Sequence, residues 1–285
     1  MKSTFNMKKP KVIVLRTAGT NCDQETAFAF SLAEADVEMV HINELARDEK
    51  FIKDYQILAI PGGFTYGDDI ASGKILANEI KYKLGEELRN FINSGKLMIG
   101  ICNGFQVLVK SGILPGLDIG KIEATLSFND SGSFIDKWVY LKVEDRNQKP
   151  ENRNQRTPLG FVPRLCSGQA RGREGRCIWT KGLKETIYLP IAHGEGKFIP
   201  RDKKVLNQLK KNGQIVFRYS DNPNGSVDDI AGICDTTGRI LGMMPHPERH
   251  ILGTQHPRWT REGLKKSGDG FKIFENAIRY AREKL

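Results

Sequence analysis

Short apolar runs alternate with amphipathic stretches along the first 113 residues of the chain. The apolar runs are five or six residues long, as in strands that are buried on both faces of a parallel sheet. Between them, apolar residues recur three and four positions apart, which is typical of helices that pack on a sheet. The pattern predicts strands at Lys11–Arg16, Val37–Ile42, Tyr55–Ile60 and Leu97–Ile101, and helices from about Asp23 to Ala35, from about Ala71 to Asn93 and from Phe105 onward.

This alternation predicts an α/β fold with a mostly parallel central sheet and helices on both faces. Ligand sites of such sheets lie at the carboxyl ends of the strands. A Pro61-Gly62-Gly63 segment and Cys102 each follow a predicted strand directly. We therefore expect both at that edge of the sheet.

The pattern changes after Pro115, and from Glu144 to Lys184 periodicity is lost. No internal repeat or low-complexity segment is present. We predict a single domain over residues 1–285 that carries an irregular basic insertion at about residues 130–184. Further strands are predicted at Ile122–Phe128, Trp138–Val143, Ile187–Ala192, Ile215–Tyr219, Asp229–Cys234 and Ile240–Met244, and a last helix near Asp269–Glu283.

Positive charge is concentrated in the insertion. Residues 142–184 hold eleven Lys and Arg against four Asp and Glu, which is most of the formal net charge of +10. One interpretation is a nucleic-acid-binding module whose arginines neutralise phosphates and whose aromatic rings stack on bases. Because no RNP, KH or helix-turn-helix signature is present, we favour a docking surface or a solvated face. The residues concerned are Arg153, Arg156, Arg164, Arg171, Arg173, Arg176, Phe161 and Trp179.

Composition narrows the class of protein. Hydrophobic content of 39% and charged content of 27% are ordinary for a soluble globular protein. No apolar run has the length of a membrane span, and the N-terminal residues lack the apolar core of a signal peptide. The five cysteines are scattered and form no C-x-x-C pair, so we expect neither a disulfide framework nor a zinc site, and the default localisation is a reducing cytoplasm.

Cys102 is the centre of a G-x-C-x-G segment, Gly100–Gly104, which is the nucleophile-elbow pattern with cysteine in place of serine. A strand that turns sharply into a helix strains the backbone of the central residue, and glycines two positions away avoid collisions across the turn. The following helix N-terminus favours a thiolate. The segment predicts a nucleophilic cysteine; the alternative is a buried structural cysteine at a strand end.

A cysteine nucleophile needs a base, and His246 is the best placed of the five histidines. It follows the predicted strand Ile240–Met244, with Glu248 two residues on and prolines at 245 and 247 that stiffen the backbone. In a Cys-His-Glu set the imidazole moves the proton, and the carboxylate fixes its tautomer and orientation. The alternative is an exposed turn with a solvated His and Glu.

Three motifs in this order, Pro61–Phe64, Gly100–Gln106 and Pro245–Glu248, resemble the marks of the class I, or triad, glutamine amidotransferases. Finer matches are similar to one family within that class, the glutaminase subunits of phosphoribosylformylglycinamidine synthase in purine biosynthesis. The finer matches are Gly19–Asp23, Gly62–Asp68, His193–Gly196 and Pro245–Arg249.

The resemblance covers residues 11–128 and about 187–283. Two segments, Asp130–Lys184 and Gln255–Gly263, depart from the compact form of the family, and we interpret them as elaborations. Cys22 lacks the flanking glycines of an elbow, so we interpret it as a small buried hydrophobe rather than a second nucleophile.

The resemblance implies a glutaminase that hydrolyses L-glutamine to glutamate and ammonia through Cys102, His246 and Glu248. It also implies an oxyanion hole formed by backbone N–H groups, and it implies no metal site. The oxyanion hole would involve Gly62, Gly63 and Asn103, and the glutamine substrate would contact Gln106, His193, Gly194 and Glu195.

Ammonia that escapes into water is protonated and lost, so the resemblance implies partners. They are a synthetase subunit, which uses ATP and Mg²⁺ to make phosphoribosylformylglycinamidine from formylglycinamide ribonucleotide, and a small accessory subunit. The chain has no G-x-x-x-x-G-K-[ST] motif, and we expect it to bind no cofactor itself. Two enzyme alternatives stay open: an amidotransferase that feeds a different acceptor, and a cysteine hydrolase or peptidase on the same elbow.

Overall fold

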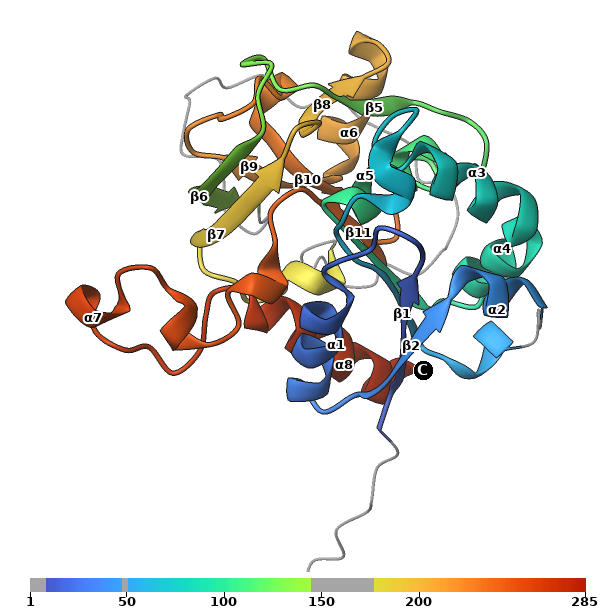
Figure 1. Cartoon of the computed structure of the whole chain (residues 1–285), viewed down its shortest axis with the longest axis horizontal. Coiled ribbons are helices and arrows are strands. Elements are labelled where there is room, and N and C mark those ends of the chain that lie inside the picture. Colours follow the sequence, from blue (N-terminus) through green and yellow to red (C-terminus); the bar gives the residue numbers. More distant parts are fainter. Residues whose placement is uncertain (1–8, 48–50, 145–176) are drawn as a thin grey trace, which may run out of the picture.

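The computed structural model describes residues 9–47, 51–144 and 177–285 (Figure 1). Within these ranges a nine-stranded sheet forms the centre of the molecule. Its first five strands are parallel to one another, and the last four each run antiparallel to the preceding strand. The strand order is β2 (Asp36–His41), β1 (Lys11–Arg16), β3 (Ile57–Ile60), β4 (Leu97–Ile101), β11 (Ile240–Met243), β10 (Ile230–Cys234), β9 (Ile215–Tyr219), β6 (Ile135–Val143) and β7 (Thr186–His193).

The central strands are apolar because both of their faces are covered. Every residue of β3 and β4 is buried, and both are continuous apolar runs. The edge strand β2 has a mixed sequence and buries little besides Val40. The predicted α/β fold with helices around a large, mostly parallel sheet is confirmed.

Helices cover two faces of the parallel strands. From β1 the chain crosses the sheet in one direction through α1 (Asp23–Leu32) to β2, and from β3 it crosses in the other direction through α3 (Lys74–Lys83) and α4 (Gly85–Asn93) to β4. Right-handed crossovers in opposite directions place their helices on opposite faces. The C-terminal helix α8 (Phe271–Lys284) joins α1, where the rings of Phe30 and Phe274 meet edge to face at 4.9 Å.

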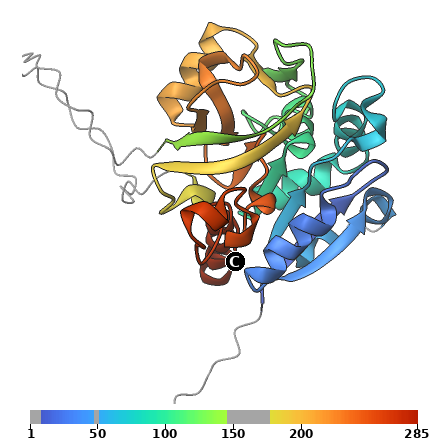
Figure 2. The ribbon, with the colours of Figure 1, turned by 60° about the vertical axis from the view of Figure 1, so that its left-hand side comes forward.

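The change of direction between β1 and β3 is a topological switch point, where α/β sheets place their sites. The loops that follow these two strands lie side by side, and Thr20 and Gly63 form an isolated β-bridge between them. The next strand, β4, leads into α5 (Asn103–Lys110), which packs against α3. Figure 2 shows the antiparallel strands standing to one side of this centre.

The predicted helix over residues 71–93 is wrong in one respect, because it is two helices. Leu84 between α3 and α4 has φ −128° and ψ 11°, outside the helical region, and Gly85 begins the second helix. The apolar spacing continues across this break because both helices bury the same face. Its buried members are Leu76, Ile80, Leu84, Leu88 and Phe91.

The strand predicted at Ile122–Phe128 is present as β5 (Ala124–Ser127), whereas its antiparallel partner β8 (Lys197–Pro200) has no counterpart among the predicted strands. The two form a separate two-stranded sheet. α6 (Lys203–Asn212) is marked in the sequence by its ends: the Asp202 carboxylate accepts from the Val205 N–H at 2.8 Å, and Gly213 ends it at φ 61°. The remaining helical segments are α2 (Ile42–Arg47), α7 (Trp259–Glu262), η1 (Phe51–Asp54), η2 (Thr65–Asp68), η3 (Ile178–Thr180), η4 (Val227–Asp229), η5 (Pro247–Arg249) and η6 (Gly253–Gln255).

Within the range predicted as an insertion, about residues 130–184, the strand predicted at Trp138–Val143 is present as part of β6 and pairs in the main sheet. Residues 145–176 lie outside the described residues, and with them Phe161 and the six arginines considered for nucleic acid. Trp179 is 0% exposed, and its indole Nε1 donates to the Arg239 carbonyl at 2.9 Å. This ring is therefore a core residue and presents no face for base stacking.

The second departure, Gln255–Gly263, packs on the antiparallel strands. It contains α7, and the Arg258 guanidinium lies 5.4 Å from the centre of the Tyr188 ring of β7. In the described ranges no helix is both long and apolar enough to cross a membrane.

Candidate active site

Cys102 stands at a sharp strand-to-helix turn between β4 and α5, as the elbow pattern predicts. Its backbone has φ 51° and ψ −107°, a conformation that L-residues rarely adopt. A Cβ added to Gly104 would lie 1.9 Å from the Ile60 carbonyl oxygen, and one added to Gly100 would lie 2.5 Å from the Gly104 carbonyl oxygen. The two glycines are therefore required by close backbone packing around the turn.

Parallel pairing of β11 with β4 brings His246 close to Cys102. In the register of β4 and β11, Ile101 lies opposite Met243, and the Cys102 N–H donates to the Met243 carbonyl at 2.8 Å. Both chains leave the sheet there, so His246 emerges beside Cys102. A Cβ added to Gly62 would lie 2.9 Å from His246 Cε1 and 3.5 Å from Cys102 Cβ. The thiol and the imidazole thus meet against one glycine.

Glu248 orients the imidazole. His246 Nδ1 and Glu248 Oε1 are 2.7 Å apart, and the side chains are 2% and 0% exposed. Burial by itself disfavours the imidazolium, but the Glu248 carboxylate and the Cys102 sulfur outweigh it and hold the pKa of His246 well above its ordinary value. The stabilisation from this charge is complete below about pH 6.5 and is lost as pH rises through the folded-state pKa.

The Gly62-Gly63 turn is held by the loop after β1. The N–H groups of Asn21 and Cys22 both donate to the Gly62 carbonyl, at 3.4 and 3.2 Å. Gly63 has φ 147°, and a Cβ there would lie 2.7 Å from the Gly19 carbonyl oxygen. The turn therefore lies beside Cys102 without side chains of its own.

Asn103 is the first residue of α5, where backbone N–H groups lack intrahelical acceptors. Its side chain points away from the thiol into a polar network: Asn103 Oδ1 accepts from Thr65 Oγ1 at 2.7 Å, and Nδ2 donates to Gln106 Oε1 at 2.9 Å. The oxyanion role predicted for Gly62, Gly63 and Asn103 stays a prediction that this placement accommodates.

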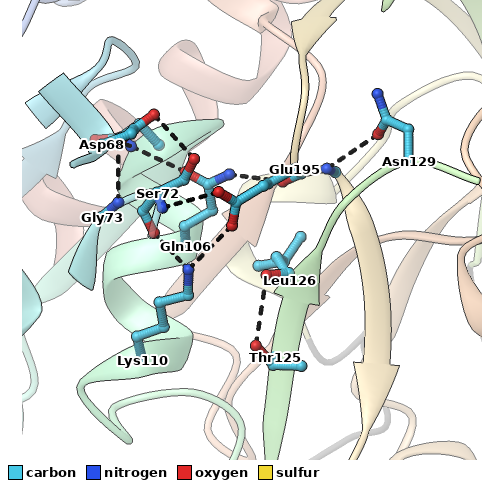
Figure 3. Close-up of polar contacts among 11 residues, drawn as sticks. Asp68, Ser72, Gly73, Gln106, Lys110, Thr125, Leu126, Asn129 and Glu195 are labelled. Carbon is cyan, nitrogen blue, oxygen red and sulfur yellow. Dashed lines mark hydrogen bonds and ion pairs between the residues drawn. The ribbon is translucent and has the colours of Figure 1, made fainter. Parts of the chain in front are cut away.

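Figure 3 shows Gln106 and Glu195 engaged with each other rather than free. Gln106 is 2% exposed, and its Nε2 donates to the Glu195 carbonyl at 2.6 Å. The Glu195 carboxylate accepts from the Ser72 N–H at 3.1 Å and pairs with Lys110 Nζ at 3.4 Å. Glutamine contact by Gln106, Gly194 and Glu195 remains a prediction, and it requires some of these bonds to be exchanged.

His193 ends β7 beside the same site and stays neutral. Burial, assisted by the charge of His246, lowers the pKa of His193 to about 4. Its Nδ1 lies 3.1 Å from Asn129 Oδ1, and a Cβ on Gly196 would lie 2.1 Å from its Cε1. His193 is therefore locked in position, and its predicted contact with the substrate is untested.

Cys22 belongs to this site, which the interpretation as a small hydrophobe missed. The residue is buried, but its sulfur accepts from Arg249 Nη2 at 3.1 Å, and it lies 3.1 Å from the position of a Gly62 Cβ. The signal was its location at the end of the loop between β1 and α1, at the same sheet edge as Cys102.

The fold and these side chains have the arrangement of a triad hydrolase: a cysteine on a nucleophile elbow, with a histidine and a carboxylate after the neighbouring strand. The family model of the CobB/CobQ-like glutamine amidotransferase domain matches residues 9–157 and 159–281. The chain therefore belongs to the CobB/CobQ-like glutamine amidotransferases and, by the relatives that follow, to their branch of PurQ subunits.

Two curated relatives are named phosphoribosylformylglycinamidine synthase subunit PurQ. The protein from Dehalococcoides mccartyi is 46% identical over an alignment of 284 positions that covers 97% of this chain and 100% of that one. The protein from Methanococcus maripaludis is 41% identical over an alignment of 295 positions that covers 95% of this chain and 97% of that one. Among solved structures, a chain of PurLQS from Thermotoga maritima matches with a TM-score of 0.69 at 29% identity, covering 95% of this chain and 99% of that one.

The elbow packing predicts a large effect of Gly104→Ala. The added methyl group would collide with the Ile60 carbonyl, so we expect the free energy of unfolding to fall by about 3 kcal/mol. The control is Gly85→Ala, where no atom lies within 4 Å of the added Cβ and a gain of about 0.5–1 kcal/mol is expected. Urea unfolding measures both, and equal midpoints for the two variants would contradict the packing.

The lowered pKa of His193 predicts that the folded protein loses stability in acid. Between its ordinary pKa of 6.5 and its folded value of about 4, the unfolded chain takes up a proton that the folded chain refuses. Stability should therefore fall as pH drops through this window, by about 3 kcal/mol in all. In His193→Gln this share of the pH dependence should vanish. Urea unfolding at several pH values tests it, and parallel curves for the two proteins would refute it.

Proposed function

We propose that the chain is the glutaminase subunit of a phosphoribosylformylglycinamidine synthase. The observation that carries this proposal is the convergence of an elbow cysteine with a buried His246–Glu248 pair in a chain of the PurQ family. The raised pKa of His246 supports an imidazolium beside Cys102 near neutral pH. An imidazolium in this position has a proton ready for the leaving group.

The reaction proceeds in two halves. The Cys102 thiolate attacks the side-chain carboxamide carbon of L-glutamine, and N–H groups of the Gly62-Gly63 turn and of Asn103 stabilise the oxyanion. His246 gives its proton to the nitrogen as the C–N bond breaks, which releases ammonia and leaves a glutamyl thioester. Water then attacks the thioester and passes a proton to His246, the C–S bond breaks, and glutamate leaves with the thiolate restored.

Glu248 acts through the imidazole. Its bond to Nδ1 leaves Nε2 to face the thiol and stabilises the positive charge that His246 carries in each half of the reaction. No metal takes part in this scheme, because the thiolate supplies the nucleophile and backbone groups stabilise the oxyanion.

The partners proposed are those of the relatives. The ammonia passes to a synthetase subunit, which binds ATP and Mg²⁺ and makes phosphoribosylformylglycinamidine from formylglycinamide ribonucleotide, with a small accessory subunit completing the assembly. A synthetase that sheltered the ammonia would cover the mouth of the site. The free thiols Cys22, Cys102, Cys177 and Cys234 suit a reducing cytoplasm.

Two exposed aromatic rings mark the surface where we place the synthetase. Phe64, directly after the Gly62-Gly63 turn, is 45% exposed, and Phe134 is 53% exposed, with ring centres 6.1 Å apart. Phe134 also lies 3.9 Å from the position of a Cβ on Gly194, beside His193. Paired exposed aromatic rings are typical of interaction surfaces.

Cys102→Ala tests the chemistry. In the complex with the synthetase, we expect glutamine-dependent synthesis to fall by about 10³-fold or more, because the variant lacks the thiol that forms the thioester. Added ammonia at high pH should still support synthesis, which shows that the partner is intact. Retention of glutamine-dependent turnover by the variant would refute the assignment of the nucleophile.

Phe134→Asp tests the surface. Placing a charge in the interface should weaken binding to the synthetase about tenfold or more, measured as the Kd of complex formation. The matched control is Tyr82→Asp, since Tyr82 is 77% exposed and lies near the C-terminal end of α3. If both variants bind with unchanged affinity, the docking surface lies elsewhere.

A further inference from the structure

Cys22, His246 and Glu248 form a cluster of metal-ligating side chains that the proposed reaction does not require as a set. One ligand atom from each lies within 4.8 Å of the other two. All three residues are nine-tenths buried or more, with exposures of 1%, 2% and 1%. Spacing along the chain gives no hint of this cluster, since it is assembled by the loops that follow β1 and β11.

The cluster has unused ligand capacity. Among the described residues, His246 Nε2 and Glu248 Oε2 are buried without a hydrogen-bond partner. Buried polar atoms of this kind call for an explanation, and one explanation is a ligand. Because Glu248 Oε1 bonds to Nδ1, the other ring nitrogen of His246, Nε2, is the atom that faces the sulfurs of Cys22 and Cys102, and the contacts of these two sulfurs with the imidazole raise its pKa.

We propose that this cluster is an inhibitory site for a thiophilic divalent cation, with Zn²⁺ as the representative ion. Cys22 Sγ and His246 Nε2 bind the ion, Cys102 Sγ supplies the third ligand, and Glu248 holds the ring through Nδ1. Two thiolates and one imidazole are a ligand set typical of zinc, and a carboxylate behind the histidine is the usual support. The bound ion occupies the nucleophile and the base together, so glutamine hydrolysis stops.

The charges around the cluster balance with the ion in place. Two thiolates and the Glu248 carboxylate are opposed by Zn²⁺ and by Arg249, whose Nη2 already donates to Cys22 Sγ at 3.1 Å. Zinc binds the thiolate rather than the thiol, so binding releases the thiol protons of the cluster. Glu25, which pairs with Arg249 at 3.3 Å, is the remaining nearby charge and lies partly exposed.

The binding step stands on the cluster alone, whereas the inhibition rests on the proposed glutaminase function. The two are measured separately. Zn²⁺ binding to the full chain is measured by competition with a chromogenic chelator, and Co²⁺ serves as a probe whose thiolate charge-transfer absorption reports sulfur ligation. Glutamine hydrolysis is then measured in the complex with the synthetase, as the ratio of rates with and without Zn²⁺ in each variant.

Cys22→Ser is the test variant, because its hydroxyl retains the size and polar contacts of the thiol but is a poor zinc ligand. We expect Zn²⁺ to bind at least tenfold more weakly and the Co²⁺ thiolate absorption to decrease. The ratio of glutaminase rates should rise toward one. Cys177→Ser and Cys166→Ser are the controls, and they should bind Zn²⁺ and be inhibited as the unaltered chain is.

Unchanged Zn²⁺ affinity in Cys22→Ser, or loss of binding in Cys166→Ser instead, would overturn the proposal. Should Cys22→Ser fold poorly, as circular dichroism would show, Cys102→Ala replaces it in the binding assay and should weaken Zn²⁺ there as well. Loss of zinc binding in Cys22→Ser together with full glutaminase activity in Cys102→Ala would refute the proposed function and leave the metal site standing.

Discussion

Parallel pairing of β4 with β3 on one side and β11 on the other is the constraint on which the site depends. It fixes the register of Ile101 against Met243, so Cys102 and His246 leave the sheet at the same level. It also maintains the positive φ of Cys102, a conformation that costs about 1–3 kcal/mol and persists only when its surroundings permit no other. With every residue of β4 buried and Gly104 against the Ile60 carbonyl, the turn has no space in which to relax.

Two buried histidines in this site show how one carboxylate decides a protonation state. His193 and His246 are both almost wholly buried, and burial lowers the pKa of each. His246 has Glu248 at 2.7 Å, whereas His193 has only the neutral Asn129 and the charge of His246 itself. Their pKa values therefore move in opposite directions. One imidazole carries the proton, and the other stays neutral beside it, so the two do not repel.

The centre of this fold could be predicted from the sequence because its signals are local. The apolar run of β4, the two elbow glycines and the segment around His246 each lie within a few residues, and the register of two strands does the rest. The features that the sequence did not predict depend on contacts between residues far apart in the chain. Cys22 becomes part of the site only because β1 and β3 flank the switch point, and no periodicity reports that Gln106 bonds to Glu195. The break at Leu84 was hidden because the apolar stripe continues through it.

The position of Cys22 follows from how the Gly62-Gly63 turn is held. Gly62 and Gly63 have no side chains that could fix the conformation of their turn. The loop after β1 fixes it instead, because the N–H groups of Asn21 and Cys22 donate to the Gly62 carbonyl. A backbone held that closely carries its side chain to the imidazole as well. The sulfur then accepts from Arg249, the neighbour of Glu248, and so joins the loop after β1 to the segment that carries His246 and Glu248. The Cys22 thiol thus connects the loop after β1 with the segment that carries His246 and Glu248. The same arrangement brings its sulfur to the imidazole beside which Cys102 lies.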